Sequence, residues 1–254
     1  MMEADVLPVP ASSPPLAKPL LELTLSGKAI GGRQIIGAVQ LALEHGEILA
    51  IVGPSGCGKS TLLRILAGLD TDYQGRVRVA SVAPAPGLAD VGFVFQEPRL
   101  LPWLTVAQNV GFDARARDGR HPRVAELLAE VGLTEFADAW PKALSGGMAQ
   151  RAAIARGLFR QPRLLLLDEP FSAVDAFTRK RLQDLLLGIV SRHRTSLVIV
   201  THDIDEAVYL ADRVVVLSAP PARVLAQIPV PWPHPRERED ARQPQFARRV
   251  LDAF

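Results

Sequence analysis

A glycine-rich run beginning at residue 53 has the residue types and spacing of a phosphate-binding loop. It reads Gly-Pro-Ser-Gly-Cys-Gly-Lys-Ser-Thr and lies between an apolar stretch and a helix-like stretch. Backbone N–H groups of such a loop turn inward around phosphate oxygens, and the following helix directs its positive end at the same anion. We expect Lys59 to contact the β- and γ-phosphates of a nucleotide and Ser60 to coordinate Mg²⁺. The residues expected to bind the nucleotide are Gly53, Pro54, Ser55, Gly56, Cys57, Gly58, Lys59, Ser60 and Thr61.

Two adjacent carboxylates, Asp168 and Glu169, follow the apolar run Leu164 to Leu167. A continuous apolar run of this length favours a buried parallel strand, which delivers both acids to the carboxyl edge of a sheet, where ligands bind. We expect Asp168 to hold Mg²⁺, directly or through water, and Glu169 to orient and deprotonate an attacking water. An acidic loop without such a role is the alternative. The phosphate loop in the same chain disfavours it.

The segment from Leu144 to Arg151, Leu-Ser-Gly-Gly-Met-Ala-Gln-Arg, resembles the signature sequence of the ABC ATPases. Ser145 is a good helix N-cap, and the two glycines leave the first helical N–H groups open to an anion. The resemblance implies that this helix end meets the γ-phosphate held by a second copy of the chain in a head-to-tail dimer, with ATP and Mg²⁺ as cofactors. The residues that would act across the dimer are Ser145, Gly146, Gly147 and Gln150.

Four further positions are assigned by the same resemblance. Gln96 is similar to the Q-loop glutamine that approaches Mg²⁺ and water, and His202 to the switch histidine that contacts the γ-phosphate. Asp175 is similar to the D-loop aspartate that couples the two sites. Ile30 stands where most members have an aromatic residue that stacks on adenine, so the resemblance implies an aliphatic adenine contact here.

The resemblance covers roughly residues 20 to 235 and is strongest to importers of the nitrate, sulfonate and taurine group. The stretch from Gln96 to Trp103, Gln-Glu-Pro-Arg-Leu-Leu-Pro-Trp, is characteristic of that group. It implies that Leu100, Leu101 and Trp103 form an apolar floor for a transmembrane permease subunit. Packing of the three side chains inside the helical part of the chain is the alternative. An extracytoplasmic solute-binding protein is implied as an indirect partner.

Composition limits the other function classes. The 29 basic and 27 acidic residues give a net charge of +2, which offers little support for nucleic-acid binding. A soluble ABC ATPase acting on nucleic acid or the ribosome is disfavoured, because the 48 positions from Gln96 to Leu144 (144 − 96) leave no room for a binding insertion. The complete set of catalytic residue types likewise disfavours a nucleotide sensor without turnover.

The single cysteine, Cys57, excludes an intramolecular disulfide framework and suits a reducing compartment. A reactive thiol in the phosphate loop is an alternative role for it. No apolar run approaches the roughly 20 residues that a membrane-spanning helix needs. These features favour the cytoplasmic side, and the resemblance to importers implies a peripheral location on the cytoplasmic face of the inner membrane.

The elements that must position these residues predict an α/β fold of the phosphate-loop NTPase type. We expect an antiparallel β-subdomain, a mainly parallel core sheet and a helical insertion. The predicted domains are a flexible proline-rich tail at 1–19, an ABC ATPase domain at 20–235 with a helical subdomain at about 97–157, and a C-terminal tail with a short helix at 236–254. The predicted strands are 20–25, 39–43, 164–167 and 197–200, and the predicted helices are 105–117, 123–131, 145–159 and 177–192. The chain from Ala219 onward is expected to lie across the surface.

Overall fold

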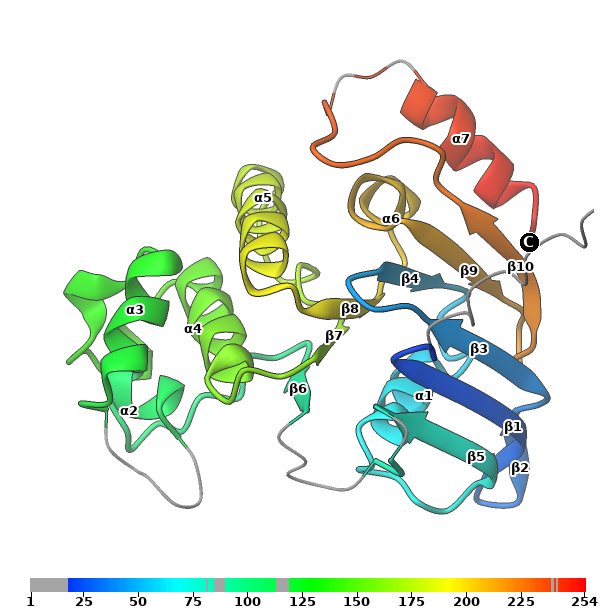
Figure 1. Cartoon of the computed structure of the whole chain (residues 1–254), viewed down its shortest axis with the longest axis horizontal. Helices are drawn as coiled ribbons and strands as arrows, with labels where there is room; N and C mark the ends of the chain where they lie inside the picture. Colours follow the sequence, from blue (N-terminus) through cyan, green and yellow to red (C-terminus); the bar gives the residue numbers. More distant parts are fainter. Residues whose placement is uncertain (1–17, 81, 85–89, 113–118, 239, 241) are drawn as a thin grey trace, which may run out of the picture.

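The computed structural model describes residues 18–80, 82–84, 90–112, 119–238, 240 and 242–254. It is an α/β fold with two sheets, as the sequence predicted (Figure 1). The strands are β1 (Leu21–Ile30), β2 (Arg33–Ile36), β3 (Val39–Leu43), β4 (Ile48–Val52), β5 (Gln74–Val79), β6 (Val91–Val94), β7 (Leu164–Asp168), β8 (Ser196–Val200), β9 (Arg213–Leu217) and β10 (Val224–Pro229). The helices are α1 (Lys59–Leu66), α2 (Val106–Val110), α3 (Pro122–Glu130), α4 (Gly146–Leu158), α5 (Ala176–His193), α6 (Ile204–Leu210) and α7 (Arg242–Leu251), with short 3₁₀ turns at Thr134–Phe136 and Pro141–Ala143.

The core sheet has the strand order β10-β9-β4-β8-β7-β6, in which only β10 is antiparallel to its neighbour. Strands β4, β7 and β8 are buried along their whole length, which explains their uninterrupted apolar sequences. The register pairs Val200 of β8 with Asp168 on one side and with Ile51 on the other. The loops that follow β4, β7 and β8 therefore emerge at one edge of the sheet.

The second sheet is antiparallel and has β1 at its centre, with β3 and β5 paired along it and β2 paired to its end. Its strands alternate buried and exposed residues, because one face packs inward and the other faces water. Helix α1 and one face of the core sheet complete the apolar layer beneath it, through side chains such as Leu62, Leu66, Ile51 and Leu166. Helix α1 is thereby fixed between the two sheets.

Helices α2, α3 and α4 gather at one side of the molecule, away from the antiparallel sheet (Figure 1). Thr105 caps α2 in a capping box with Gln108. The predicted helix at 105–117 is wrong in length, because α2 ends at Val110 and Gly111 follows it. Residues 113–118 of that prediction lie outside the described residues, as do residues 1–17 of the predicted N-terminal tail.

The C-terminal part of the chain corrects the expectation of a surface segment. Strand β10 pairs with β9 and covers what would be an open edge of the core sheet. After it, Val230, Phe246 and Val250 are buried in the main core, and the Phe246 ring packs against Trp232 at a centroid distance of 5.3 Å. The many prolines concealed this packing, since they interrupt the apolar periodicity without preventing burial.

Candidate nucleotide-binding site

The phosphate loop joins β4 to α1 at the carboxyl edge of the core sheet. Gly58 has φ of 105°, a left-handed conformation that favours glycine, and it stands at the start of α1 without a capping side chain. The first N–H groups of α1 are therefore not taken up by a side-chain cap, which suits an anion at this helix end.

Lys59 and Cys57 turn into this loop. The Lys59 ammonium donates to the carbonyl oxygens of Gly53, at 2.8 Å, and Pro54, at 3.0 Å, and the side chain is buried. A fixed positive charge thus sits inside the loop. Cys57 is fully buried, and burial raises the pKa of its thiol although the Lys59 charge opposes this. A buried, protonated thiol disfavours the alternative role of Cys57 as a reactive group.

Ser60 and Asp168 meet beside the loop. The Ser60 hydroxyl donates to Asp168 Oδ1 at 2.8 Å. Burial raises the pKa of the Asp168 carboxyl, and the Ser60 hydrogen bond acts in the opposite direction. Within the described residues, no group of three or more His, Cys, Asp or Glu side chains gathers as a metal cage. A hydroxyl and one carboxylate next to a phosphate site form the kind of oxygen set that Mg²⁺ uses, since that ion takes its remaining ligands from water and phosphates.

Glu169 and His202 lie just after the ends of the paired strands β7 and β8, where their side chains meet. His202 Nδ1 lies 3.0 Å from Glu169 Oε2. Glu169 has φ of 42°, and its backbone N–H donates to the Val200 carbonyl at 2.9 Å, which holds the strained residue in place. The ring of His202 is 60% exposed, so the pair faces the open edge of the sheet.

A pocket of about 440 Å³ joins most of these groups. Gln96 and Ile30, from distant parts of the chain, line it together with the phosphate loop, and Gln96 Nε2 donates to the Ser172 hydroxyl at 3.2 Å. The Ile30 side chain is 52% exposed at this pocket. The lining residues are Ile30, Ile35, Ser55, Gly56, Gly58, Lys59, Ser60, Thr61, Gln96 and Glu169.

The signature segment does not line this pocket. Ser145 caps α4 by accepting a hydrogen bond from the Met148 N–H at 3.3 Å. Gly147 has no space for a side chain, because a Cβ there would lie 2.5 Å from Thr178 Cγ2. Gln150 is buried within its own chain, and its amide nitrogen meets no acceptor among the described residues. Asp175 caps α5, and hydrogen bonds from Thr178 lower its pKa.

The three residues predicted to meet a membrane subunit differ in their environments. Trp103 is 67% exposed, whereas Leu100 is partly buried against the main core. Leu101 is also partly buried, and its backbone N–H and carbonyl both bond to the side chain of Asn109. The partial burial of Leu100 and Leu101 agrees with packing inside the helical part of the chain, and the contact with a membrane subunit stays a prediction. Asn109 could not be identified from the sequence, because its role depends on the burial of its side-chain amide, which no local sequence pattern predicts.

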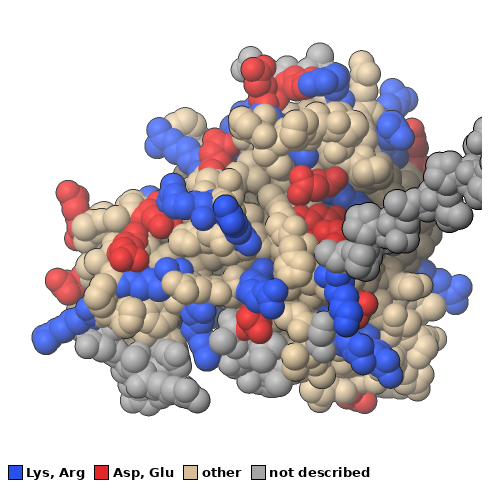
Figure 2. Space-filling view, in the orientation of Figure 1, with Lys and Arg blue, Asp and Glu red and all other residues tan. Residues whose placement is uncertain are grey.

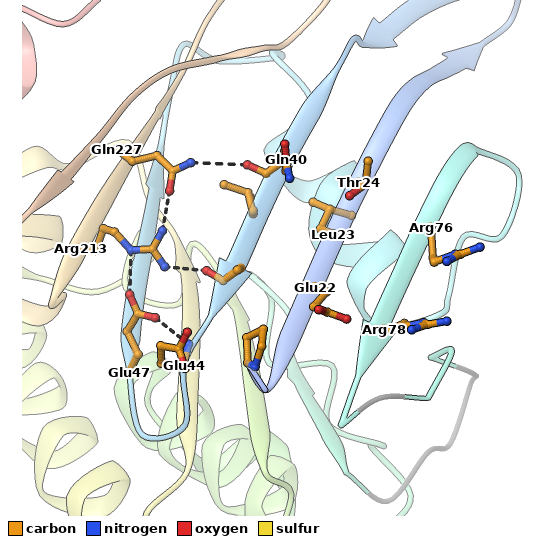
Figure 3. A pocket seen from close by; sticks show the side chains of 13 residues that line it. Glu22, Leu23, Thr24, Gln40, Glu44, Glu47, Arg76, Arg78, Arg213 and Gln227 are labelled. Carbon is orange, nitrogen blue, oxygen red and sulfur yellow. Dashed lines mark hydrogen bonds and ion pairs between the residues drawn. The ribbon is translucent and has the colours of Figure 1, made fainter. Parts of the chain in front are cut away.

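A second, larger pocket of about 760 Å³ lies on the outer face of the antiparallel sheet (Figure 3). Arg213 extends toward it, but its guanidinium is taken up by Glu47 at 2.8 Å, the Ala42 carbonyl at 2.6 Å and Gln227 at 2.5 Å. None of the predicted site residues lines this pocket. The predicted nucleotide chemistry therefore does not involve this pocket.

Comparison with known proteins identifies the family. The family described as ABC transporter matches residues 36–172. The chain is 58% identical over 238 residues to the "Aliphatic sulfonates import ATP-binding protein SsuB 2" of Burkholderia lata, covering 94% of this chain and 87% of that protein. It is 55% identical over 237 residues to the "Aliphatic sulfonates import ATP-binding protein SsuB 1" of Pseudomonas syringae pv. syringae, covering 92% and 94%.

Solved structures agree with this relationship. A dimeric ATP-binding cassette in a post-hydrolysis state, bound to ADP and Pi, superposes with a TM-score of 0.70 at 30% identity, covering 84% of this chain and 99% of that one. The cbiO1 protein of Clostridium perfringens, part of an ABC transporter complex, gives a TM-score of 0.75 at 25% identity, covering 92% and 93%. The predicted fold class is confirmed. The chain belongs to the ABC transporter family, as one of its ATP-binding and ATP-hydrolysing subunits.

Proposed function

We propose that this chain drives the uptake of aliphatic sulfonates, as the ATPase of an import complex. The observation that carries the substrate class is the identity of 58% and 55% to two proteins named for aliphatic sulfonate import, each aligned over more than nine tenths of this chain. Nitrate is the competing substrate of a different class, and taurine is an aliphatic sulfonate that also carries an amino group. A soluble ABC ATPase acting on nucleic acid is not favoured, since basic and acidic side chains are mixed over the face drawn in Figure 2.

We assign the binding of the nucleotide phosphates to the loop at 53–61. Lys59 is already held inside that loop, and its ammonium would exchange carbonyl contacts for phosphate oxygens. Ser60, Asp168 and Gln96 would hold Mg²⁺ there, and the bound cation would neutralise charge on the phosphates. Ile30 would contact adenine from the exposed side of the same pocket.

Hydrolysis is assigned to Glu169 and His202. Glu169 would orient the attacking water and accept its proton, because its carboxylate lies at the sheet edge beside the phosphate loop. His202 would hold that carboxylate through the 3.0 Å contact and reach the γ-phosphate from its exposed side. The strained backbone at Glu169 supports this assignment, since such strain gathers at functional sites.

A second copy of the chain would complete the site. Ser145, Gly146, Gly147 and Gln150 lie outside the phosphate pocket of their own chain, which supports a role across a head-to-tail dimer. Asp175, at the start of α5, would couple the two sites. The likeness to a structure that is itself a dimer with ADP and Pi supports the same arrangement.

Membrane permease subunits are the further partners. Trp103, with Leu100 and Leu101 beneath it, would receive them, and an extracytoplasmic solute-binding protein would deliver the solute. Among the described residues, no helix combines the length and hydropathy that crossing a bilayer requires. We propose a peripheral location at the cytoplasmic face of the membrane, where an ATPase subunit would meet the permease subunits.

Turnover and transport can be tested separately. Glu169→Gln should keep ATP binding and abolish Mg²⁺-dependent hydrolysis, whereas Glu135→Gln, an exposed control, should leave both unchanged. Substantial hydrolysis by Glu169→Gln would remove Glu169 from the role of general base. In vesicles that contain the chain, its permease and its binding protein, ATP should drive uptake of ethanesulfonate more strongly than that of nitrate. The opposite preference would refute the substrate assignment.

A further inference from the structure

Glu206, in the first turn of α6, is a buried carboxyl group that the proposed mechanism does not use. Its side chain is 6% exposed, and burial raises its pKa to about 7. The groups that face it are Gln183 and Arg179 from α5, together with Thr201 and Asp203 from the loop before α6. Burial of a carboxyl group is costly unless hydrogen bonds satisfy it. A buried carboxyl group at this position therefore calls for a functional explanation.

The first of these contacts leads to the switch histidine. Thr201 directly precedes His202 and is 3% exposed. Its hydroxyl accepts a hydrogen bond from the Asp203 N–H at 3.0 Å. The same hydroxyl faces the Glu206 carboxyl group across a small shared cavity and acts to lower the pKa of that group. The Asp203 carboxylate in turn accepts from the Glu206 N–H at 3.0 Å and from Arg179 at 3.3 Å. Both neighbours of His202 are thus fixed, although its own ring is largely exposed.

The second contact leads to the C-terminal segment. Gln183 Nε2 donates to Glu206 Oε2 at 3.1 Å, and Gln183 Oε1 accepts from Arg238 at 2.8 Å. A guanidinium can only donate, so Arg238 dictates that the amide oxygen of Gln183 faces it. The amide N–H₂ must then face Glu206, which must accept. Arg238 thereby determines which hydrogen bonds are available to Glu206.

Arg238 is itself firmly held. It donates to the Lys180 carbonyl at 2.7 Å and to Asp184 at 2.5 Å, and its guanidinium stacks over the Tyr209 ring at 3.9 Å. These contacts join the segment after β10 to α5 and α6. The orientation imposed on Gln183 therefore has a rigid origin.

From these contacts we propose that Glu206 is a positioning residue for ATP hydrolysis. It fixes the backbone of His202 through the Thr201 hydroxyl, and Arg238 fixes Glu206 through Gln183. The inference rests on the roles proposed above for Glu169 and His202. It adds that the C-terminal segment, far from the phosphate loop in sequence, sets the geometry of the Glu169 and His202 pair.

Arg238→Met tests the proposal, because it keeps an unbranched side chain and removes every donor. We expect kcat to fall about 10-fold, since a small displacement of a catalytic group has effects of this size or larger. The KM for ATP should change less than twofold. Gln183→Met should have the same effect. The control is Arg242→Met, which removes an exposed arginine whose side-chain hydrogen bonds, within the described part of the chain, go to Asp240. Its guanidinium also lies 5.2 Å from the centre of the Trp232 ring, away from Gln183 and Glu206.

Two further readouts separate positioning from a general loss of structure. In a His202→Ala background, Arg238→Met should cause no further loss of the residual turnover. Amide hydrogen exchange of residues 201–206 should quicken in Arg238→Met and not in Arg242→Met. An unchanged kcat, an equal further loss in the His202→Ala background, or unaltered exchange would each overturn the proposal. Absent turnover in the wild-type chain with its permease would instead contradict the proposed function. The exchange experiment would still test the positioning role, because it needs no hydrolysis.

Discussion

Replacement of Glu206 by glutamine should change how the stability of this protein depends on pH. The carboxyl group has a pKa of about 7 in the fold, against an ordinary value of 4.5, because burial disfavours its charged form. A raised pKa means that the folded state keeps a proton that the unfolded chain releases. The contribution of this group to stability is therefore greatest below pH 4.5 and is lost as pH rises through 7. The difference between the two pKa values corresponds to about 3 kcal/mol in the free energy of unfolding, since each tenfold change in proton affinity is worth about 1.4 kcal/mol.

Glutamine does not titrate, so Glu206→Gln should lack this decline. The free energy of unfolding, measured by urea titration without nucleotide at pH 5, 6, 7 and 8, should shift in favour of the variant by about 2 to 3 kcal/mol from the lowest to the highest pH. The absolute difference also contains any change in the hydrogen bond that Gln183 donates to residue 206, and this part is independent of pH. Glu135→Gln controls for the loss of one exposed charge. A difference that stays constant across the four pH values would refute the reasoning.

Three further predictions concern other parts of the molecule. Ile30→Tyr should tighten ATP binding about fivefold in a calorimetric titration, because an aromatic ring would face adenine at the exposed side of the pocket. Unchanged affinity would mean that residue 30 does not contact adenine. Phe246→Ala should lower the free energy of unfolding by about 3 kcal/mol, as expected for a buried aromatic side chain packed on Trp232. A loss below about 0.5 kcal/mol would mean that α7 is not part of the core. Cys57 should react with Ellman's reagent only as the protein unfolds, since its thiol is buried and its pKa is raised; rapid labelling of the native chain would contradict the described burial.

The fold class and most of the residues at the sheet edge could be predicted from the sequence alone. The signal was local: the apolar run before Asp168 requires a strand covered on both faces, and strands of this kind deliver the residues after them to one edge of the sheet. The glycine-rich loop could be predicted for the same reason, because phosphate binding there depends on backbone groups of consecutive residues. The chain beyond Ala219 was misjudged because its prolines break the periodicity from which strands and helices are recognised.

The side chains that support the predicted site could be identified only from the tertiary structure. Glu206, Gln183 and Arg238 come from α6, α5 and the segment after β10, and each is an ordinary polar residue in its own stretch of sequence. Their contacts exist because the sheet order places α5 beside α6 and because β10, antiparallel on β9, directs the C-terminal segment back over both helices. Periodicity reports which face of an element is buried, whereas the partner of a buried polar group depends on how distant elements pack together.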